Sequence, residues 1–337
     1  MLGRRKIFYY LLFLLGTFLL VGTVFKLGPS EVGRSFLRAD LKFIGAGIVI
    51  YLSAVTFRSL RWYVLFRHLH QKIGYFRFLP TYFVSLMIGN LTPFKSGEVV
   101  VPYLFKKNLK SKVGKGFTLI LFDRFFDILI LVLCMVMSFV LIGAKVDLPG
   151  MVRNLFWVAV LLFSLILVLI ILIFSLRNQS QQFFRKLVLR SRKRVFWQKT
   201  FRWFSRELGN FHQGIDLLKG SLIGYLVALL AVFSWACEFF AFYFFVRSVL
   251  DVPFWLILAF QILSIGIGII SFIPAGMGVG TISFVFLISL TGYSVIDAAA
   301  GGVAAQVIPL SIIYLAGISG LIFTRSLNRK AKPRAKV

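Results

Sequence analysis

Acidic residues are scarce in this sequence, which carries only 11 Asp and Glu among its 337 residues. All charged residues together make up 15% of the chain, whereas a soluble domain carries about 25%. Hydrophobic residues reach 59%, and they fall in long runs rather than in short alternations. This composition excludes a soluble globular enzyme and predicts an all-α polytopic membrane protein.

Residues that build disulfide frameworks or metal sites are also rare. The two cysteines, Cys134 and Cys237, lie singly inside apolar runs, and His68, His70 and His212 lie in basic segments without ligand spacing. Neither a disulfide framework nor a metal site is therefore expected. The sequence shows no catalytic triad and no nucleotide-binding motif, so we expect no cofactor and no enzymatic activity.

Basic residues, in contrast, are abundant, and 39 Lys and Arg give the chain a net charge of +28. They crowd beside the apolar runs, where anionic lipids and the positive-inside rule place them, so nucleic acid is not the expected partner. The apolar runs predict six membrane-spanning helices, the first retained rather than cleaved as a signal peptide. These lie at residues 7–25, 42–62, 116–143, 154–176, 221–246 and 298–324. The joins at 26–41 and 144–153 are expected to be short loops.

Two further apolar stretches contain residues that interrupt a helix. Residues 78–105 are broken in the middle, and residues 252–296 run without a charge for too long to form one helix. We predict a re-entrant helical hairpin in each, at about 78–105 and 253–291. The interrupting residues are Asn90, Pro93, Lys95, Gly97 and Glu98 in the first and Pro274, Gly276, Gly278 and Gly280 in the second.

The distribution of positive charge supports this topology. If each stretch enters and leaves the membrane on the same side, 30 of the Lys and Arg residues face the cytoplasm and seven face outward. Both termini are then cytoplasmic. The first hairpin dips in from the cytoplasm and the second from outside, so their tips meet near the midplane. Opposed interrupted helices of this kind place a substrate site in transporters.

The long cytoplasmic loop at 177–219 contains a further helical pattern. Apolar and aromatic residues recur at steps of three and four from Trp197 to Leu218, which predicts an amphipathic helix. A helix lying on anionic headgroups is favoured over a docking face for a partner.

Charged residues inside the predicted membrane region are the leading candidates for function. Each costs about 2.5 to 3.5 kcal/mol at a helix centre unless it is paired or hydrated. The alternative is that Lys95 with Glu98, and Arg124 with a carboxylate, form ion pairs that only fix the packing. The candidates are Lys95, Glu98, Asp123, Arg124, Asp127 and Glu238.

Two other groups could bind an anion. Arg58 and Arg61 are three residues apart at the cytoplasmic end of a predicted span, where ordinary charge anchoring is at least as favoured as phosphate binding. The glycines of the second break, with Gly276 and Gly278 at its centre, could expose backbone N–H groups at a helix start or could serve close helix packing.

At these positions the chain resembles the flippase-like transmembrane region of lysylphosphatidylglycerol synthases and its stand-alone relatives. The resemblance covers residues 1–324 as one transmembrane domain and implies an inner-membrane protein that moves a lipid between leaflets. In the fused enzymes that lipid is aminoacylated phosphatidylglycerol, and in relatives other amphiphiles, including hopanoid-type or glycan-linked lipids. The resemblance is carried by Arg58, Arg61-Trp62, Asn90-x-x-Pro93, Gly97-Glu98, Arg124, Asp127 and Pro274-x-Gly276-x-Gly278-Val279.

The chain departs from the family pattern at three places. Lys95 stands where Arg is frequent, Asp123 stands where Glu is common, and Gly280-Thr281 follow the second break where an acidic residue is expected. A basic tail at 325–337 stands in place of a soluble synthase domain, so aminoacyl transfer is not expected.

Together these observations predict a flippase or transporter for a polar or anionic phospholipid in the cytoplasmic membrane. The alternatives are an accessory or scaffold subunit of a lipid-modifying complex and a membrane enzyme acting on a lipid-linked substrate. Membrane lipids are the expected partners, while a lipid-synthesis enzyme partner and an oligomer stay open. The predicted substrate-binding residues are Arg58, Arg61, Asn90, Lys95, Glu98, Arg124, Asp127, Gly276 and Gly278.

Overall fold

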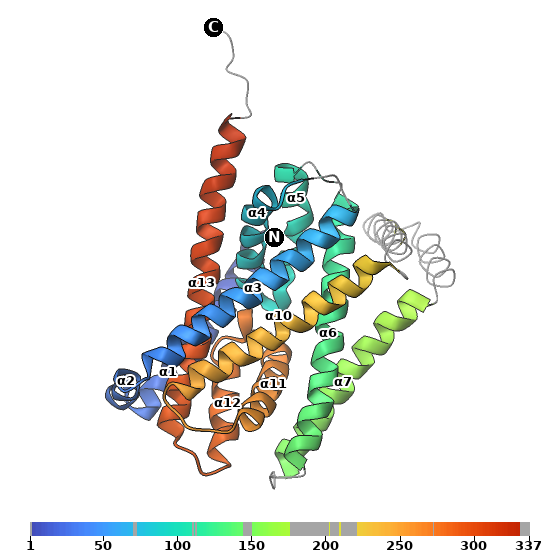
Figure 1. Ribbon diagram of the computed structural model, residues 1–337. Coiled ribbons are helices and arrows are strands. Elements are labelled where there is room, and N and C mark those ends of the chain that lie inside the picture. The colour runs from blue at the N-terminus through green and yellow to red at the C-terminus, as the bar shows by residue number, and fades with distance from the viewer. Residues whose placement is uncertain are drawn as a thin grey trace.

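The described part of the chain is built from helices alone, in a computed structural model (Figure 1). The structure describes residues 2–69, 73–109, 111, 113–143, 150–175, 202, 209, 221–271 and 273–330. No strand occurs in these residues. The predicted all-helical class is therefore confirmed, whereas the predicted amphipathic helix at 197–218 and most of the loop at 177–219 lie outside the described residues.

Three helices are long and apolar enough to cross a membrane, and they coincide with three of the six predicted spans. They are α3 (Leu41–Leu69), α10 (Leu222–Arg247) and α13 (Val295–Lys330). In α13 the part that is apolar enough to cross a membrane is Val295–Thr324. α3 and α10 contact one another along their length, and α13 packs on α4 (Tyr75–Asn90). Figure 1 shows α3 and α10 side by side across the middle of the molecule.

The other three predicted spans also lie on helices. They are α1 (Leu2–Leu27), α6 (Val113–Gly143) and α7 (Gly150–Ser175), and their crossing of a membrane stays a prediction. Many of the described apolar side chains on α7, such as Leu161, Leu165 and Leu169, are exposed, as expected for a surface that faces lipid.

The join at 26–41 is not a simple loop as predicted, because it contains the short helix α2 (Pro29–Leu37). Pro29 occupies the first turn, where its missing N–H costs nothing, and Glu31 complements the positive end of the helix dipole. The Ser35 hydroxyl donates to the Asp297 carboxylate at 2.6 Å, which fastens α2 to the start of α13. Residues 144–149 of the other join lie outside the described residues.

The first interrupted stretch folds as α4, a 3₁₀ helix η1 (Pro93–Val100) and α5 (Val101–Leu109). Thr92 takes an extended backbone conformation before Pro93, as a residue preceding proline should, and this ends α4. Its hydroxyl then accepts the Gly97 backbone N–H at 2.6 Å. A Cβ on Gly97 would lie 2.6 Å from the Ile88 carbonyl oxygen, so the turn needs glycine there.

The second interrupted stretch folds as α11 (Phe254–Ile270), a short 3₁₀ turn η2 (Pro274–Gly276) and α12 (Val279–Ser289). Positive φ angles at Ala275, Gly276 and Gly278 reverse the chain, and α11 and α12 pack against each other. Glycine is favoured at these positions because a residue with a side chain is strained in the left-handed backbone conformation that the reversal requires.

The two breaks contact each other, through η1 and η2. Figure 1 shows α4 and α5 in the upper part of the molecule and α11 and α12 in the lower part. Two clusters of buried apolar side chains hold these parts: one joins α6, α7, α10, α11, α12 and α13, and the other joins α3, α4, α5, α6, α10 and α13. The region between the clusters is where the polar side chains gather. That these hairpins enter a membrane from opposite faces stays a prediction.

Candidate functional site

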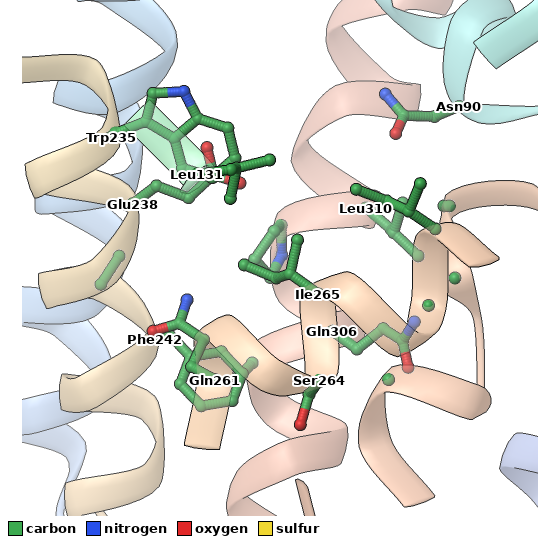
Figure 2. A pocket seen from close by; sticks show the side chains of 18 of the residues that line it. Asn90, Leu131, Trp235, Glu238, Phe242, Gln261, Ser264, Ile265, Gln306 and Leu310 are labelled. Carbon is green, nitrogen blue, oxygen red and sulfur yellow. The ribbon is translucent and has the colours of Figure 1, made fainter. Parts of the chain in front are cut away.

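A cavity of about 430 Å³ lies where the two breaks meet the long helices (Figure 2). Its volume lies within the usual range for small-molecule sites. Side chains of α3, α4, α6, α7, α10, α11, α12 and α13 and of the turn η2 line it. Its polar lining residues are Tyr51, Arg58, Asn90, Arg124, Asp127, Glu238, Gln261, Ser264, Thr281 and Gln306.

One side of the cavity carries charges, and we call Arg58, Arg124, Asp127 and Glu238 the charged wall. Arg58 of α3 forms an ion pair with Glu238 of α10, which ties together two helices that pack closely. The Arg58 guanidinium also lies 5.7 Å from the ring of Trp235, in a cation–π contact. Both partners of the Arg58–Glu238 pair line the cavity.

Asp127 of α6 is the most connected group of the charged wall. It accepts hydrogen bonds from the Arg61 guanidinium at 2.9 Å and from the Trp235 indole N–H at 3.0 Å. The Arg124 guanidinium lies 3.5 Å away on the same helix. Asp127 therefore joins α3, α6 and α10 at one point.

Arg124 connects the same network to the first break. Its guanidinium donates to the Glu98 carboxylate of η1 at 2.6 Å and reaches Asp123 at 3.5 Å. This ion pair links the 3₁₀ turn η1 to α6.

Behind the wall, Arg61 is fully buried at 0% exposure between two carboxylates. It pairs with Asp123, which is also buried, and with Asp127. A guanidinium enclosed in this way is stable only because both carboxylates are present, since desolvating a single charge inside a protein costs several kcal/mol. Arg61 therefore holds the two aspartates in place and does not line the cavity.

The network contains one more carboxylate than it has arginines among the described residues. Three arginines, Arg58, Arg61 and Arg124, face four carboxylates, Glu98, Asp123, Asp127 and Glu238. Each guanidinium has at least one carboxylate partner. An anionic ligand that reaches Arg58 or Arg124 therefore meets a guanidinium that already has a carboxylate partner.

Other polar residues of the lining are uncharged, and we call four of them, Gln261, Ser264, Thr281 and Gln306, the amide wall. Figure 2 shows the carboxamides of Gln261 and Gln306 on either side of the apolar side chain of Ile265. The Gln306 oxygen accepts hydrogen bonds from the Thr281 hydroxyl at 2.6 Å and from the Gly278 backbone N–H at 3.2 Å. Gln306 therefore ties α13 to the start of α12.

The structure brings most of the predicted site residues together. Five of them line the cavity itself: Arg58, Asn90, Arg124, Asp127 and Gly276. A narrow space of about 10 Å³ next to the cavity is lined by Glu98 together with Arg58, Arg124 and Asp127. Lys95 belongs to η1, but its side chain lies outside the described residues, so its predicted role stays a prediction.

Two details differ from the sequence interpretation. Glu98 pairs with Arg124, whereas the sequence analysis weighed a pair between Glu98 and Lys95. The backbone N–H groups of Gly276 and Gly278, predicted to bind an anion, already donate to Ile273 and Gln306. Neighbouring residues thus satisfy these amides, and the two glycines serve the chain reversal.

The sequence analysis missed the amide wall, because it searched the predicted spans for charges. Gln261 and Gln306 are uncharged polar residues in otherwise apolar stretches, and a search for any strongly polar residue inside a span finds both. Trp235 was also missed, because an aromatic residue in an apolar helix gives no sign that its N–H serves a buried carboxylate. Within the described residues, no group of three or more His, Cys, Asp or Glu is placed to hold a metal ion.

Comparison with known proteins gives one match over nearly the whole chain. Residues 7–317 match the family model described as the lysylphosphatidylglycerol synthase TM region. Among curated relatives, a UPF0104 membrane protein of Pyrococcus horikoshii is 26% identical over 133 residues, which is 39% of this chain and 40% of that protein. A UPF0104 membrane protein of Methanothermobacter thermautotrophicus is 28% identical over 129 residues, which is 38% of this chain and 37% of that protein. The chain thus aligns with about two fifths of the length of these relatives.

Proposed function

The chain belongs to the lysylphosphatidylglycerol synthase transmembrane family, and from this premise we propose that it moves a polar or anionic phospholipid between the leaflets of a membrane. The membrane is the cytoplasmic (inner) membrane, with both termini in the cytoplasm, and the lipid moves without a catalytic step. The observation that carries this proposal is the cavity between the two helix breaks, with ionised groups on one of its walls.

The position of the cavity suits a lipid headgroup. Unwound backbone is tolerated at membrane depth only where protein or a water-filled space receives it, and both η1 and η2 are such segments. A crossing lipid needs a polar path only for its headgroup, since its acyl chains can remain in the bilayer. Apolar side chains such as Ile166 of α7 and Leu131 of α6 complete the lining, as expected where acyl chains pass close by.

The charged wall supplies the contacts for the headgroup. Arg58 and Arg124 line the cavity, and each holds a carboxylate through one guanidinium nitrogen; a phosphate can replace that carboxylate and accept from the guanidinium in a forked geometry. In this proposal Glu238 and Glu98 neutralise the two arginines when no headgroup is bound. Arg61 positions Asp123 and Asp127 and does not touch the lipid.

A proteoliposome assay tests this function. Purified protein is reconstituted into vesicles containing a phospholipid with a fluorescent acyl chain, and an impermeant quencher reports the fraction in the outer leaflet. We expect the wild type to exchange the lipid and Arg58→Gln and Arg124→Gln each to slow exchange at least tenfold. Ser53→Ala is the matched control, because Ser53 is a half-buried residue of α3 outside the cavity lining, and its hydroxyl bonds only within its own helix. Equal exchange by all four proteins, or exchange by none, would contradict the proposal.

The pairing of every described arginine of the network favours one second candidate. Internal ion pairs of this kind are what a purely structural core contains, and such a core suits an accessory or scaffold subunit of a lipid-modifying complex. In that case the arginine variants lower stability but leave the activity of the partner enzyme unchanged in intact membranes. Measuring that activity beside the vesicle assay separates the two functions.

A further inference from the structure

The two partners of the Arg58–Glu238 ion pair are not held equally firmly. The Arg58 side chain is 11% exposed, and its guanidinium also lies against the ring of Trp235, which is itself fixed by its hydrogen bond to Asp127. The Glu238 side chain is 28% exposed, and among the described residues its carboxylate is hydrogen-bonded to Arg58 alone. Glu238 is therefore the partner that can move away, while Arg58 keeps its place.

A carboxylate that leaves Arg58 finds no second free cation in the described lining of the cavity. The lining residues that α11 and α13 contribute are uncharged and do not titrate. Arg124 already holds Glu98. Besides the Arg58–Glu238 pair, the charged or titratable residues of the lining come from α3 and α6, which both pack against α10, and they are Tyr51, Arg124 and Asp127.

An anionic headgroup that takes over the N–H donors of Arg58 therefore leaves Glu238 without a counter-ion. It also brings a second negative charge close to that carboxylate, and like charges at short range disfavour the ionised form. An isolated carboxylate inside a protein is neutralised by a proton, because keeping it ionised away from water costs far more. One proton taken up then balances the one negative charge that the headgroup brings.

We propose that Glu238 takes up one proton from water when an anionic headgroup displaces it from Arg58, and returns the proton when the headgroup leaves and the ion pair re-forms. This inference rests on the proposed transport function and names its coupling ion. The net charge of the cavity is the same with and without the lipid. Lipid and proton pass as an electrically neutral pair, so a pH difference across the membrane drives lipid movement.

Proton uptake during lipid binding tests this coupling in the full-length protein solubilised in detergent. The probe is short-chain phosphatidylmethanol, because its phosphodiester keeps one negative charge between pH 6 and pH 8. Calorimetry in two buffers of different ionisation enthalpy counts the protons taken up per lipid, and we expect about one for the wild type near pH 6. Since the complex then holds more protons than the free protein, binding strengthens as the pH falls, by at least about tenfold from pH 8 to pH 6.

Glu238→Gln is the decisive variant, because its side-chain oxygen can still accept from Arg58 but cannot take up a proton. It should bind the lipid with no proton uptake and with less than about a twofold change in affinity over the same pH range. Asp251→Asn is the matched control, since Asp251 is an exposed carboxylate that pairs with Arg247 outside the cavity lining. This control should behave as the wild type does.

Melting temperatures in detergent identify a variant that fails to fold. In that case the wild type decides by infrared difference spectroscopy, because lipid binding should produce the carbonyl band of a protonated carboxylic acid.

The outcomes separate this inference from the proposed function. Lipid binding without proton uptake, equal uptake by the wild type and Glu238→Gln, loss of uptake in Asp251→Asn, or the lack of the carboxylic acid band would each overturn the inference and leave the proposed function standing. Failure of the wild type to bind the lipid at any pH would contradict the proposed function, and the coupling with it.

Discussion

The two walls of the cavity differ in the charge of their polar groups. On the charged wall every described arginine already has a carboxylate partner, and the network extends through Arg61 and Asp123 into the core. On the amide wall the Gln261 oxygen has no partner among the described residues. The ion pairs of the charged wall join α3, α6, α10 and η1, whereas the amide wall carries neutral groups only. The comparison therefore predicts large effects on stability at the first wall and small ones at the second.

The largest effect is expected from Arg61→Leu. The substitution leaves Asp123 and Asp127 buried without their shared counter-ion, and breaking a buried pair from one side costs about 3–5 kcal/mol. Thermal or denaturant unfolding in detergent, followed by circular dichroism, measures the loss. If Arg61→Leu were as stable as Ser53→Ala, the idea that the charged wall holds the helices together would be wrong.

A smaller loss is expected from Trp235→Phe, which keeps an aromatic ring but removes the indole N–H that Asp127 accepts. A hydrogen bond to a charged group contributes about 1.5–3 kcal/mol. The same unfolding measurement checks this value. Phe239, a neighbour of Trp235 in the same apolar cluster, provides the control Phe239→Leu, which changes packing without touching the network. An unchanged stability of Trp235→Phe would mean that Asp127 does not need this donor.

The turn η2, beside the amide wall, should be less sensitive. Gly276→Ala places a side chain at a φ of +60° and 3.3 Å from the Gly268 Cα, so both backbone strain and crowding act. Gly292→Ala is the matched control, because it has a φ of +79° but open space around the new methyl group. We expect Gly292→Ala to cost about 1 kcal/mol and Gly276→Ala clearly more. Equal losses would show that η2 is not tightly packed against α11.

The smallest effect on stability is expected from Ser264→Ala on the amide wall. Its hydroxyl bonds only to a carbonyl of its own helix, so its removal should change the free energy of unfolding by less than about 0.5 kcal/mol. A stability loss as large as that of Trp235→Phe would remove the distinction between the two walls.

The sequence predicted the outline of the fold from physical rules that act locally. Length and hydropathy identified α3, α10 and α13, and the positions of Pro93 and Pro274 identified both helix breaks. Such signals are reliable because a helix in lipid must satisfy its own backbone, so an interruption has to be visible in the residues.

Which residues pair could not be predicted in the same way. Arg61 and Asp123 are 62 positions apart, and Arg58 and Glu238 are 180 apart, so their meeting depends on how whole helices pack. The charges alone indicated that ion-pair partners must exist, but not that Glu98 would pair with Arg124. The amide wall was missed for a related reason. A neutral polar residue costs less inside a membrane than a charged one, and a count of charges does not find it.

Water access to the cavity is the most direct test of a headgroup path between the two breaks. Ser264→Cys, in a chain with Cys134 and Cys237 replaced by alanine, places one thiol on the amide wall, and Ser138→Cys places one at a buried site of α6 outside the cavity lining. The account predicts that a water-soluble thiol reagent modifies Cys at 264 at least tenfold faster than Cys at 138, and that phosphatidylglycerol protects it. Equally slow reaction at both sites in folded protein would contradict a polar passage.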